Sequence, residues 1–192
     1  MALLYRQEYP RRYKSGYLST SLLRTILRLQ SPTKGRISFF RQGEPVSSLD
    51  MGYLPQKNSI DSRFPITVEE VVASGLMGNT QKGNTKFDSK KEIDEMLDLM
   101  GITALRNKPI GVLSGGQLQR SLFGRALISK PEMLILDEPA SYIDRQFGNR
   151  MFEILRDLSS NGTTIMMVSH EIEPFITLSN RNLYINHILG DR

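Results

Sequence analysis

Two adjacent carboxylates, Asp137 and Glu138, are the residues in this chain best suited to chemistry. They follow an apolar run, Met133–Leu136, which has the length and composition of a buried strand. In an open α/β sheet, ligands bind in the crevice at the carboxyl ends of the strands. One acid in that position can hold a metal ion while its neighbour polarises a water molecule. The pair therefore predicts a metal-dependent site at a strand end.

A second cluster, Leu113–Gln117, reads Leu-Ser-Gly-Gly-Gln and directly precedes a helix-like run, Leu118–Ser129. Free N–H groups and the helix dipole attract phosphate at the start of a helix. A phosphate-binding helix start followed by a metal-binding strand end indicates nucleotide chemistry.

Together with Gln119 and Arg120, the first cluster resembles the signature motif of ATP-binding cassette (ABC) ATPases, and Met133–Pro139 resembles their Walker B strand. The resemblance extends from about Ser21 to the C-terminus. It implies an α/β fold, namely a P-loop NTPase core with an inserted helical subdomain and with the N-terminal strands partly missing. The implied core covers residues 21–62 and 130–192, and the helical subdomain covers about 63–129.

The family's Walker A loop precedes its first helix, which the apolar spacing of Leu22–Leu27 matches. This alignment places the motif lysine at Ser19 and the two motif glycines at Tyr13 and Leu18. We therefore expect residues 1–20 to be a degenerate segment that replaces the usual strands and the Walker A loop of a truncated chain. An alternative is a disrupted or wrongly translated gene segment that joins the frame near residue 21.

The resemblance also assigns roles to single residues. Gln56 ends a short strand as the Q-loop glutamine, Asp144 occupies the D-loop, and His170 matches the switch histidine. The implied catalytic residues are Glu138, His170 and Gln56. The implied nucleotide contacts are Ser114, Gly115, Gly116, Gln117, Asp144, Gly16 and Thr20, and the implied Mg²⁺ ligands are Asp137, Gln56 and Thr20.

The elements between these motifs follow from local patterns. Arg36–Phe40 predicts a strand, and Thr67 predicts a helix cap ahead of Glu69 and Glu70, whose charges favour a helix start. Residues 78–88 predict a loop. Further helices are expected at 90–100 and 147–158, and further strands at 163–168 and, as a closing pair, at 182–189.

Composition limits the functional classes. The 192 residues include no cysteine, so disulfide frameworks and thiolate metal sites are excluded. The net charge of +5 is partly concentrated in the N-terminal segment, where no nucleic-acid motif accompanies it, and we expect no nucleic-acid partner. No apolar run has the length of a membrane span. We expect a cytoplasmic protein that sits peripherally on the membrane through a separate partner.

Phe64–Val68 resembles a segment of the ABC subunits of zinc and manganese importers. The resemblance implies an ATPase that uses ATP and Mg²⁺ and couples hydrolysis to metal import. Its partners would be an integral-membrane permease, a second ABC subunit (the same chain or an intact paralogue) and, indirectly, a substrate-binding protein. Two alternatives remain: a non-hydrolysing subunit that completes the site of an intact partner, and a nonfunctional remnant.

Overall fold

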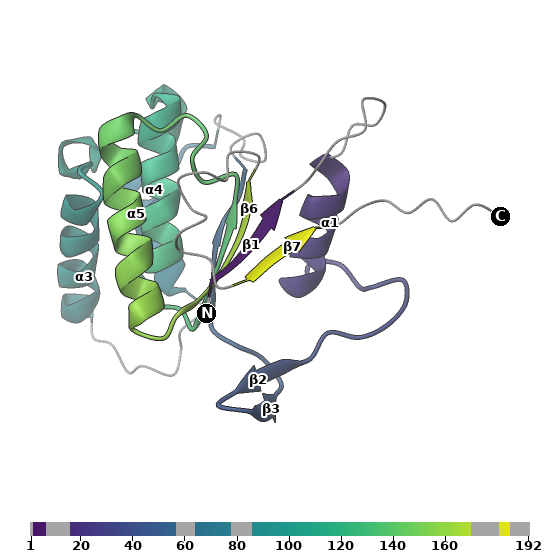
Figure 1. The fold of residues 1–192 in the computed structure, drawn as a ribbon. Coiled ribbons are helices and arrows are strands. Elements are labelled where there is room, and N and C mark those ends of the chain that lie inside the picture. The colour runs from purple at the N-terminus through teal and green to yellow at the C-terminus, as the bar shows by residue number, and fades with distance from the viewer. Residues whose placement is uncertain (1, 7–15, 57–63, 78–85, 170–180, 185–192) are drawn as a thin grey trace.

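A five-stranded sheet forms the centre of the molecule. The computed structural model describes residues 2–6, 16–56, 64–77, 86–169 and 181–184, and the side chains only within 21–56, 64–77 and 89–169. The strand order is β4-β5-β6-β1-β7, and every neighbouring pair is parallel (Figure 1). The strands are β1 (Ala2–Arg6), β4 (Met51–Leu54), β5 (Met133–Asp137), β6 (Thr164–Ser169) and β7 (Arg181–Tyr184).

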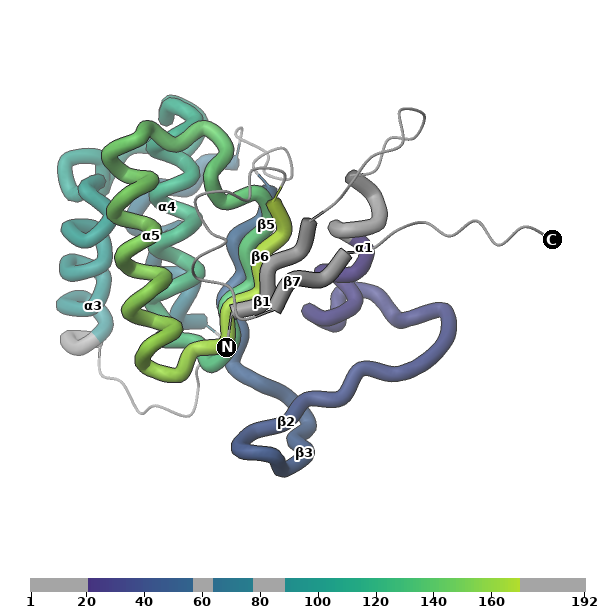
Figure 2. The backbone as a smooth tube through the Cα atoms, viewed as in Figure 1, coloured from purple at the N-terminus to yellow at the C-terminus, as the bar shows by residue number. Residues whose placement is uncertain are grey.

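Helices cover both faces of this sheet, as expected for parallel strands. The first helix, α1 (Gly16–Ile26), lies on one side, and α3, α4 and α5 stand together on the other (Figures 1 and 2). This second group comprises α2 (Val68–Ala73), α3 (Lys86–Leu99), α4 (Gly115–Leu127) and α5 (Arg145–Ser160), with the 3-10 helices η2 (Ser74–Leu76), η3 (Thr103–Leu105) and η4 (Ile110–Val112). The observed architecture is the expected α/β one.

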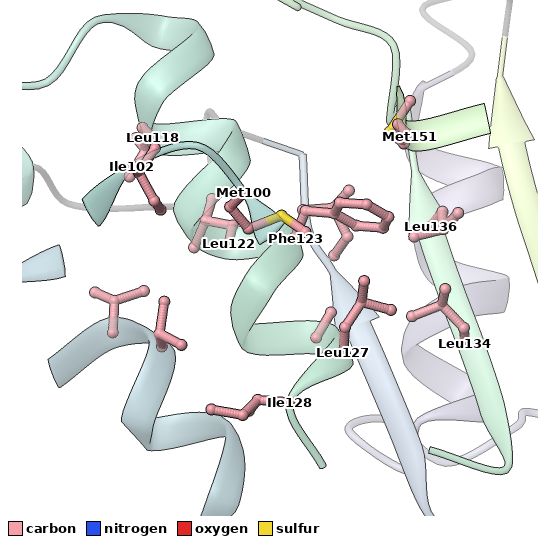
Figure 3. Packing of buried hydrophobic residues seen from close by; sticks show 14 of the residues in the cluster. Met100, Ile102, Leu118, Leu122, Phe123, Leu127, Ile128, Leu134, Leu136 and Met151 are labelled. Carbon is pink, nitrogen blue, oxygen red and sulfur yellow. The ribbon is translucent and has the colours of Figure 1, made fainter. Parts of the chain in front are cut away.

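The alternation of side chains along β5 divides the apolar residues between the two faces. Leu134 and Leu136 belong to a large cluster with the helices α2 to α5, whereas Ile135 packs with Leu23 of α1. Figure 3 shows the large cluster, in which Phe123 of α4 lies between the helices and the sheet. Because this cluster runs without interruption from the helices to the strands, α4 joins the helical residues to the sheet.

Local signals placed several elements correctly. Thr67 caps α2 through a capping box with Glu70, as its sequence position predicted. Ile93 and Leu97 of α3 are buried, as is Met100 just beyond the end of that helix. Helix α5 fits its predicted range with two extra residues at each end.

Other boundaries differ from the prediction. Helix α1 begins at Gly16, and residues 2–6, expected to lie in a segment that replaces the usual strands, instead form β1 between β6 and β7. Pairing with strands more than 150 residues away leaves no local periodicity to detect. Helix α3 starts at Lys86, inside the expected loop. The sequence pattern did not indicate this start, because the first turn of the helix is polar. Of the expected closing strand pair, Arg181–Tyr184 is a strand, and residues 185–192 lie outside the described part.

The strand predicted at Arg36–Phe40 is shifted. A hairpin of β2 (Phe39–Arg41) and β3 (Glu44–Val46) turns at Gln42 and Gly43, whose φ angles are 53° and 88°. Two consecutive positive φ values are typical of the type I′ turn that joins antiparallel strands, and that turn fixes the register. Arg41 then bonds Glu132 through two contacts, Nε to Oε1 at 2.6 Å and Nη2 to Oε2 at 2.7 Å. The hairpin is thereby attached next to the start of β5.

Candidate functional site

The carboxyl ends of the central strands lie along one edge of the sheet. The parallel register sets Leu54 beside Leu136, Asp137 beside Val168 and Arg6 beside Ser169. Helix α1 follows β1 after residues 7–15, which lie outside the described part, so its N-terminus belongs to this same edge. The paired carboxylates therefore lie at the edge where open α/β sheets bind their ligands.

Three predicted residues occupy this edge. Asp137 ends β5 with 3% of its surface exposed, and Glu138 follows it directly. Gln56 stands two residues beyond β4 and is exposed. Oxygen donors of this kind, a carboxylate and an amide, suit Mg²⁺, which keeps several water ligands. The described residues contain no cluster of three or more His, Cys, Asp or Glu side chains.

Glu138 has an unusual backbone. Its φ is 52°, in the left-handed region that costs a non-glycine residue about 1–2 kcal/mol. Two backbone bonds hold it there: its N–H donates to the Val168 carbonyl at 2.9 Å, and its carbonyl accepts from the Ser141 N–H at 3.2 Å. Strain of this kind clusters at functional sites, where the surroundings hold it in place.

The second cluster begins α4. Ser114 is the N-cap; its hydroxyl accepts from the Gln117 N–H at 3.2 Å, and Gln117 Oε1 accepts from the Ser114 N–H at 3.0 Å. This capping box uses the N–H groups of Ser114 and Gln117, and it leaves those of Gly115 and Gly116 in the first turn, where helices have no internal acceptors for them. The predicted phosphate-binding helix start is thus built as a regular N-terminus.

Gly116 allows the segment after β5 to approach this helix closely. A Cβ atom at residue 116 would lie 2.9 Å from the backbone oxygen of Tyr142. A pocket of about 380 Å³ opens beside this contact, and among its lining residues are Ser114, Gly116, Gln117 and Asp144. Four of the residues predicted to bind nucleotide therefore share one cavity on the chain surface.

Asp144 is held from both sides within its own chain. Its Oδ1 accepts from the Phe147 N–H at 2.9 Å and caps α5, while its Oδ2 pairs with the guanidinium of Arg120. These two partners, the backbone N–H first, hold the pKa of the Asp144 carboxyl below its usual range. Arg120 also lies over the Phe147 ring at 4.4 Å.

The remaining predicted residues are not fully described. Gly16 opens α1 and Thr20 lies within it, but the side chains of residues 16–20 are outside the described part. His170 follows β6 directly and is also outside it. The structure therefore brings together Ser114, Gly116, Gln117 and Asp144, and separately places Gln56, Asp137 and Glu138 along the sheet edge.

No structural contact was predicted for three side chains near these groups. Gln119 is 1% exposed and donates from Nε2 to the Pro139 carbonyl at 3.4 Å; Arg120 binds Asp144; and Tyr53 faces the α1 side of the sheet. Their partners lie 20 or more residues away, so no local pattern could reveal them. One local signal was available: the Ser-x-x-Gln spacing of 114 and 117 is that of a capping box.

Tyr53 provides a pH-dependent prediction. Burial, followed by the nearby charge of Asp137 and opposed by Arg24, raises the pKa of the Tyr53 phenol to about 12 from an ordinary 10. A raised pKa contributes stability that is complete below pH 10 and is lost as the pH rises through 12. We expect Tyr53→Phe to lower the pH dependence of the unfolding free energy in this window by about 1 kcal/mol, after discounting for partial exposure.

The measurement is denaturant unfolding at pH 8, 10 and 12, with tyrosinate absorbance followed in parallel. Tyr142→Phe, which alters an exposed tyrosine, is the matched control. Identical pH profiles for the Tyr53→Phe protein and the parent would contradict the prediction.

Known proteins resemble this chain in sequence and fold. The profile of the ABC transporter family matches residues 14–141. A "Probable metal transport system ATP-binding protein" of Chlamydia pneumoniae is 37% identical over 91% of this chain and 72% of its own length. The zinc uptake system ATP-binding protein ZurA of Listeria monocytogenes is 36% identical over 92% and 68%. The zinc import ATP-binding protein ZnuC of Hydrogenovibrio crunogenus is 31% identical over 91% and 66%.

Solved structures agree on the fold. The dimeric structure of MJ0796, a bacterial ABC transporter cassette, superposes with a TM-score of 0.76 at 21% identity and covers 95% of this chain and 80% of that one. The matched family profile spans both the signature cluster of α4 and the carboxylates that end β5. The chain therefore belongs to the ABC transporter family.

Proposed function

We propose that this chain is the ATP-binding subunit of an ABC importer for a metal ion such as zinc. The observation that carries the proposal is the likeness to ZurA and ZnuC, at 36% and 31% identity over nine-tenths of the chain. Phe64–Val68, the segment that resembles zinc and manganese importers, leads directly into α2, where Thr67 is the cap. The ion itself would be chosen by a permease and a substrate-binding protein.

The sheet edge would hold the chemistry. Asp137 would hold Mg²⁺ through water, Glu138 would polarise the attacking water, and Gln56 would contact both the ion and that water. His170 would position the γ-phosphate, and Thr20 would offer its hydroxyl to the ion. Bound Mg²⁺ supplies charge neutralisation on the phosphates. The buried carboxylate of Asp137 and the held backbone of Glu138 support these roles.

The start of α4 would serve a second ABC subunit. In a head-to-tail dimer, Ser114, Gly115, Gly116 and Gln117 would close on nucleotide bound by the partner, with Asp144 near the interface. The surface pocket beside Ser114 and Gly116 supports this role, because it opens at the helix N-terminus. A permease would receive the resulting motion at the cytoplasmic face of the membrane. None of the described helices is long and apolar enough to span a bilayer.

A second candidate function is favoured by the phosphate-loop positions. Tyr13, Leu18 and Ser19 stand where the family has two glycines and a lysine. Losing one preorganised donor typically lowers a rate by about 10²–10³. The signature cluster, in contrast, is intact in sequence and regular in structure. The chain would then complete the nucleotide site of an intact paralogue without turning over its own.

ATP hydrolysis by the purified chain distinguishes the two candidates. Turnover that falls at least about 10²-fold in Glu138→Gln would support the autonomous ATPase. Turnover only in a mixture with an intact zinc-importer ATPase, lost when Ser114→Arg fills the pocket, would support the completing subunit. A folded protein, by circular dichroism, without activity in either format would contradict both.

A further inference from the structure

One face of α4 meets the segment that follows β5. Gly116, Gln119, Arg120 and Phe123 are spaced at three and four residues, so they line a single side of the helix. Each contacts the segment Pro139–Phe147: a Cβ at Gly116 would touch the Tyr142 oxygen, and Phe123 packs edge-on against Phe147 with ring centres 6.5 Å apart. The signature helix and the residues after Glu138 thus share an extended intrachain contact.

Gln119 is the unusual member of this contact. It is 1% exposed, and its Nε2 donates to the Pro139 carbonyl at 3.4 Å, whereas its Oε1 has no hydrogen-bond partner. A buried carbonyl oxygen without a donor destabilises a folded protein, and an apolar side chain of the same length would avoid that loss. Packing stability alone therefore does not explain a glutamine at this position.

The bond from Gln119 acts on the strained turn. Pro139 directly follows Glu138, whose φ is 52° and whose N–H and carbonyl are bound by Val168 and Ser141. The hydrogen bond from the Gln119 amide to the Pro139 carbonyl tethers this turn to α4, the helix that begins with the signature cluster. The backbone that carries the Glu138 carboxylate is consequently held by β6 on one side and, through Pro139, by α4 on the other.

Arg120 holds the far end of the same segment. Its guanidinium pairs with Asp144 and lies over the Phe147 ring at 4.4 Å. The ion pair lies at the surface, with 24% of the Arg120 side chain and 55% of the Asp144 side chain exposed. Since Asp144 also caps α5, Arg120 connects α4 to the start of α5.

We propose that Gln119 and Arg120 are positioning residues that tie the Glu138 turn and Asp144 to the signature helix. These contacts couple the position of Ser114 to that of Glu138 within one chain. The consequence rests on the proposed function: Ser114 would serve the partner's nucleotide and Glu138 its own, so closure on one nucleotide would shift the carboxylate at the other. The tether itself is a property of the single chain.

Gln119→Met and Arg120→Met remove the tethers while keeping side-chain length. Arg125→Met, at an exposed position on the same helix, is the matched control. We expect Arg120→Met to raise amide hydrogen exchange at residues 144–147 about tenfold, because both the charged contact with Asp144 and the stacking on Phe147 are lost. Gln119→Met should raise exchange at the Ser141 amide, while its thermal midpoint stays within about 4 °C of the parent or increases. Amides of β5 should be unaffected.

Turnover separates positioning from mere packing. The chain is assayed both alone and mixed with an intact paralogue. In the condition that hydrolyses ATP, both variants should lower kcat about tenfold and change KM less than about twofold. Asp144→Asn added to Arg120→Met should produce little further increase in exchange, since the pair is already broken.

The outcomes are decisive in either case. Exchange at Ser141 and 144–147 that matches the Arg125→Met control would overturn the tether. Raised exchange with unchanged kcat would overturn the positioning role. If neither format hydrolyses ATP, the proposed function fails, and exchange alone still decides whether the tether exists.

Discussion

Gly52→Ala should strongly destabilise the fold. A Cβ at this position would lie 2.1 Å from the backbone oxygen of Ala126 and 3.0 Å from the Cγ of Pro131. The first contact is with helix backbone, so relief requires moving the end of α4 away from β4. Overpacking a core with a movable side chain already costs about 1–3 kcal/mol, and we expect a loss of at least about 3 kcal/mol here. Urea unfolding followed by circular dichroism measures it.

Gly148→Ala is the matched control with the opposite sign. Gly148 lies in α5, and nothing stands within 4 Å of a Cβ built there. Alanine in a helix interior is favoured over glycine by about 0.5–1 kcal/mol, so this variant should be slightly more stable than the parent. Equal stability of the Gly52→Ala and Gly148→Ala proteins would show that β4 and α4 are not in the close contact described.

Restoring the phosphate loop should produce the largest gain in activity. The triple variant Tyr13→Gly/Leu18→Gly/Ser19→Lys supplies the two glycines and the lysine that the family alignment assigns to these positions. Glycines permit close approach of backbone to phosphate, and one added cationic donor accounts for about 10²–10³ in rate. We expect steady-state ATP turnover to increase by about that factor.

Two companions make this experiment specific. The variant with Ser19→Met in place of lysine keeps the glycines and most of the side-chain length without the charge, and it should show little gain. Adding Glu138→Gln to the restored chain should remove the gain, because the carboxylate beside Asp137 would polarise the water. A restored chain as inactive as the parent would mean that the alignment of residues 13–20 with the family loop is wrong.

The parts of the fold that the sequence predicted well depend on neighbouring residues. Thr67 and Glu70 form a cap within a single turn, and the apolar run ending at Asp137 is a strand because its residues are suited to burial. The fold class followed from two motifs whose order is specific. All of these signals are local in the sequence. The parallel α/β sheet and the similarity to ABC cassettes confirm the fold class that they predicted.

The parts that could not be predicted depend on distant partners. Strand β1 has its place because Leu3 pairs with Met166 on one side and with Arg181 on the other, which no window of neighbouring residues contains. Similarly, the side chain of Arg120 pairs with Asp144, which lies 24 positions further along the chain. The assigned roles of the site residues remain predictions.

The face of the sheet covered by α1 is rich in sulfur. Met51, Met133 and Met166 pack there with Leu23 of the helix, and the first two are only partly buried. Met100, Met151 and Met167 of the opposite core are buried, whereas Met96 there is only partly buried. In a chain without cysteine, thioethers are the side chains open to mild oxidants, and a sulfoxide is polar. Oxidation of Met51 or Met133 would therefore place a polar group against α1 and loosen the packing of that helix on the sheet.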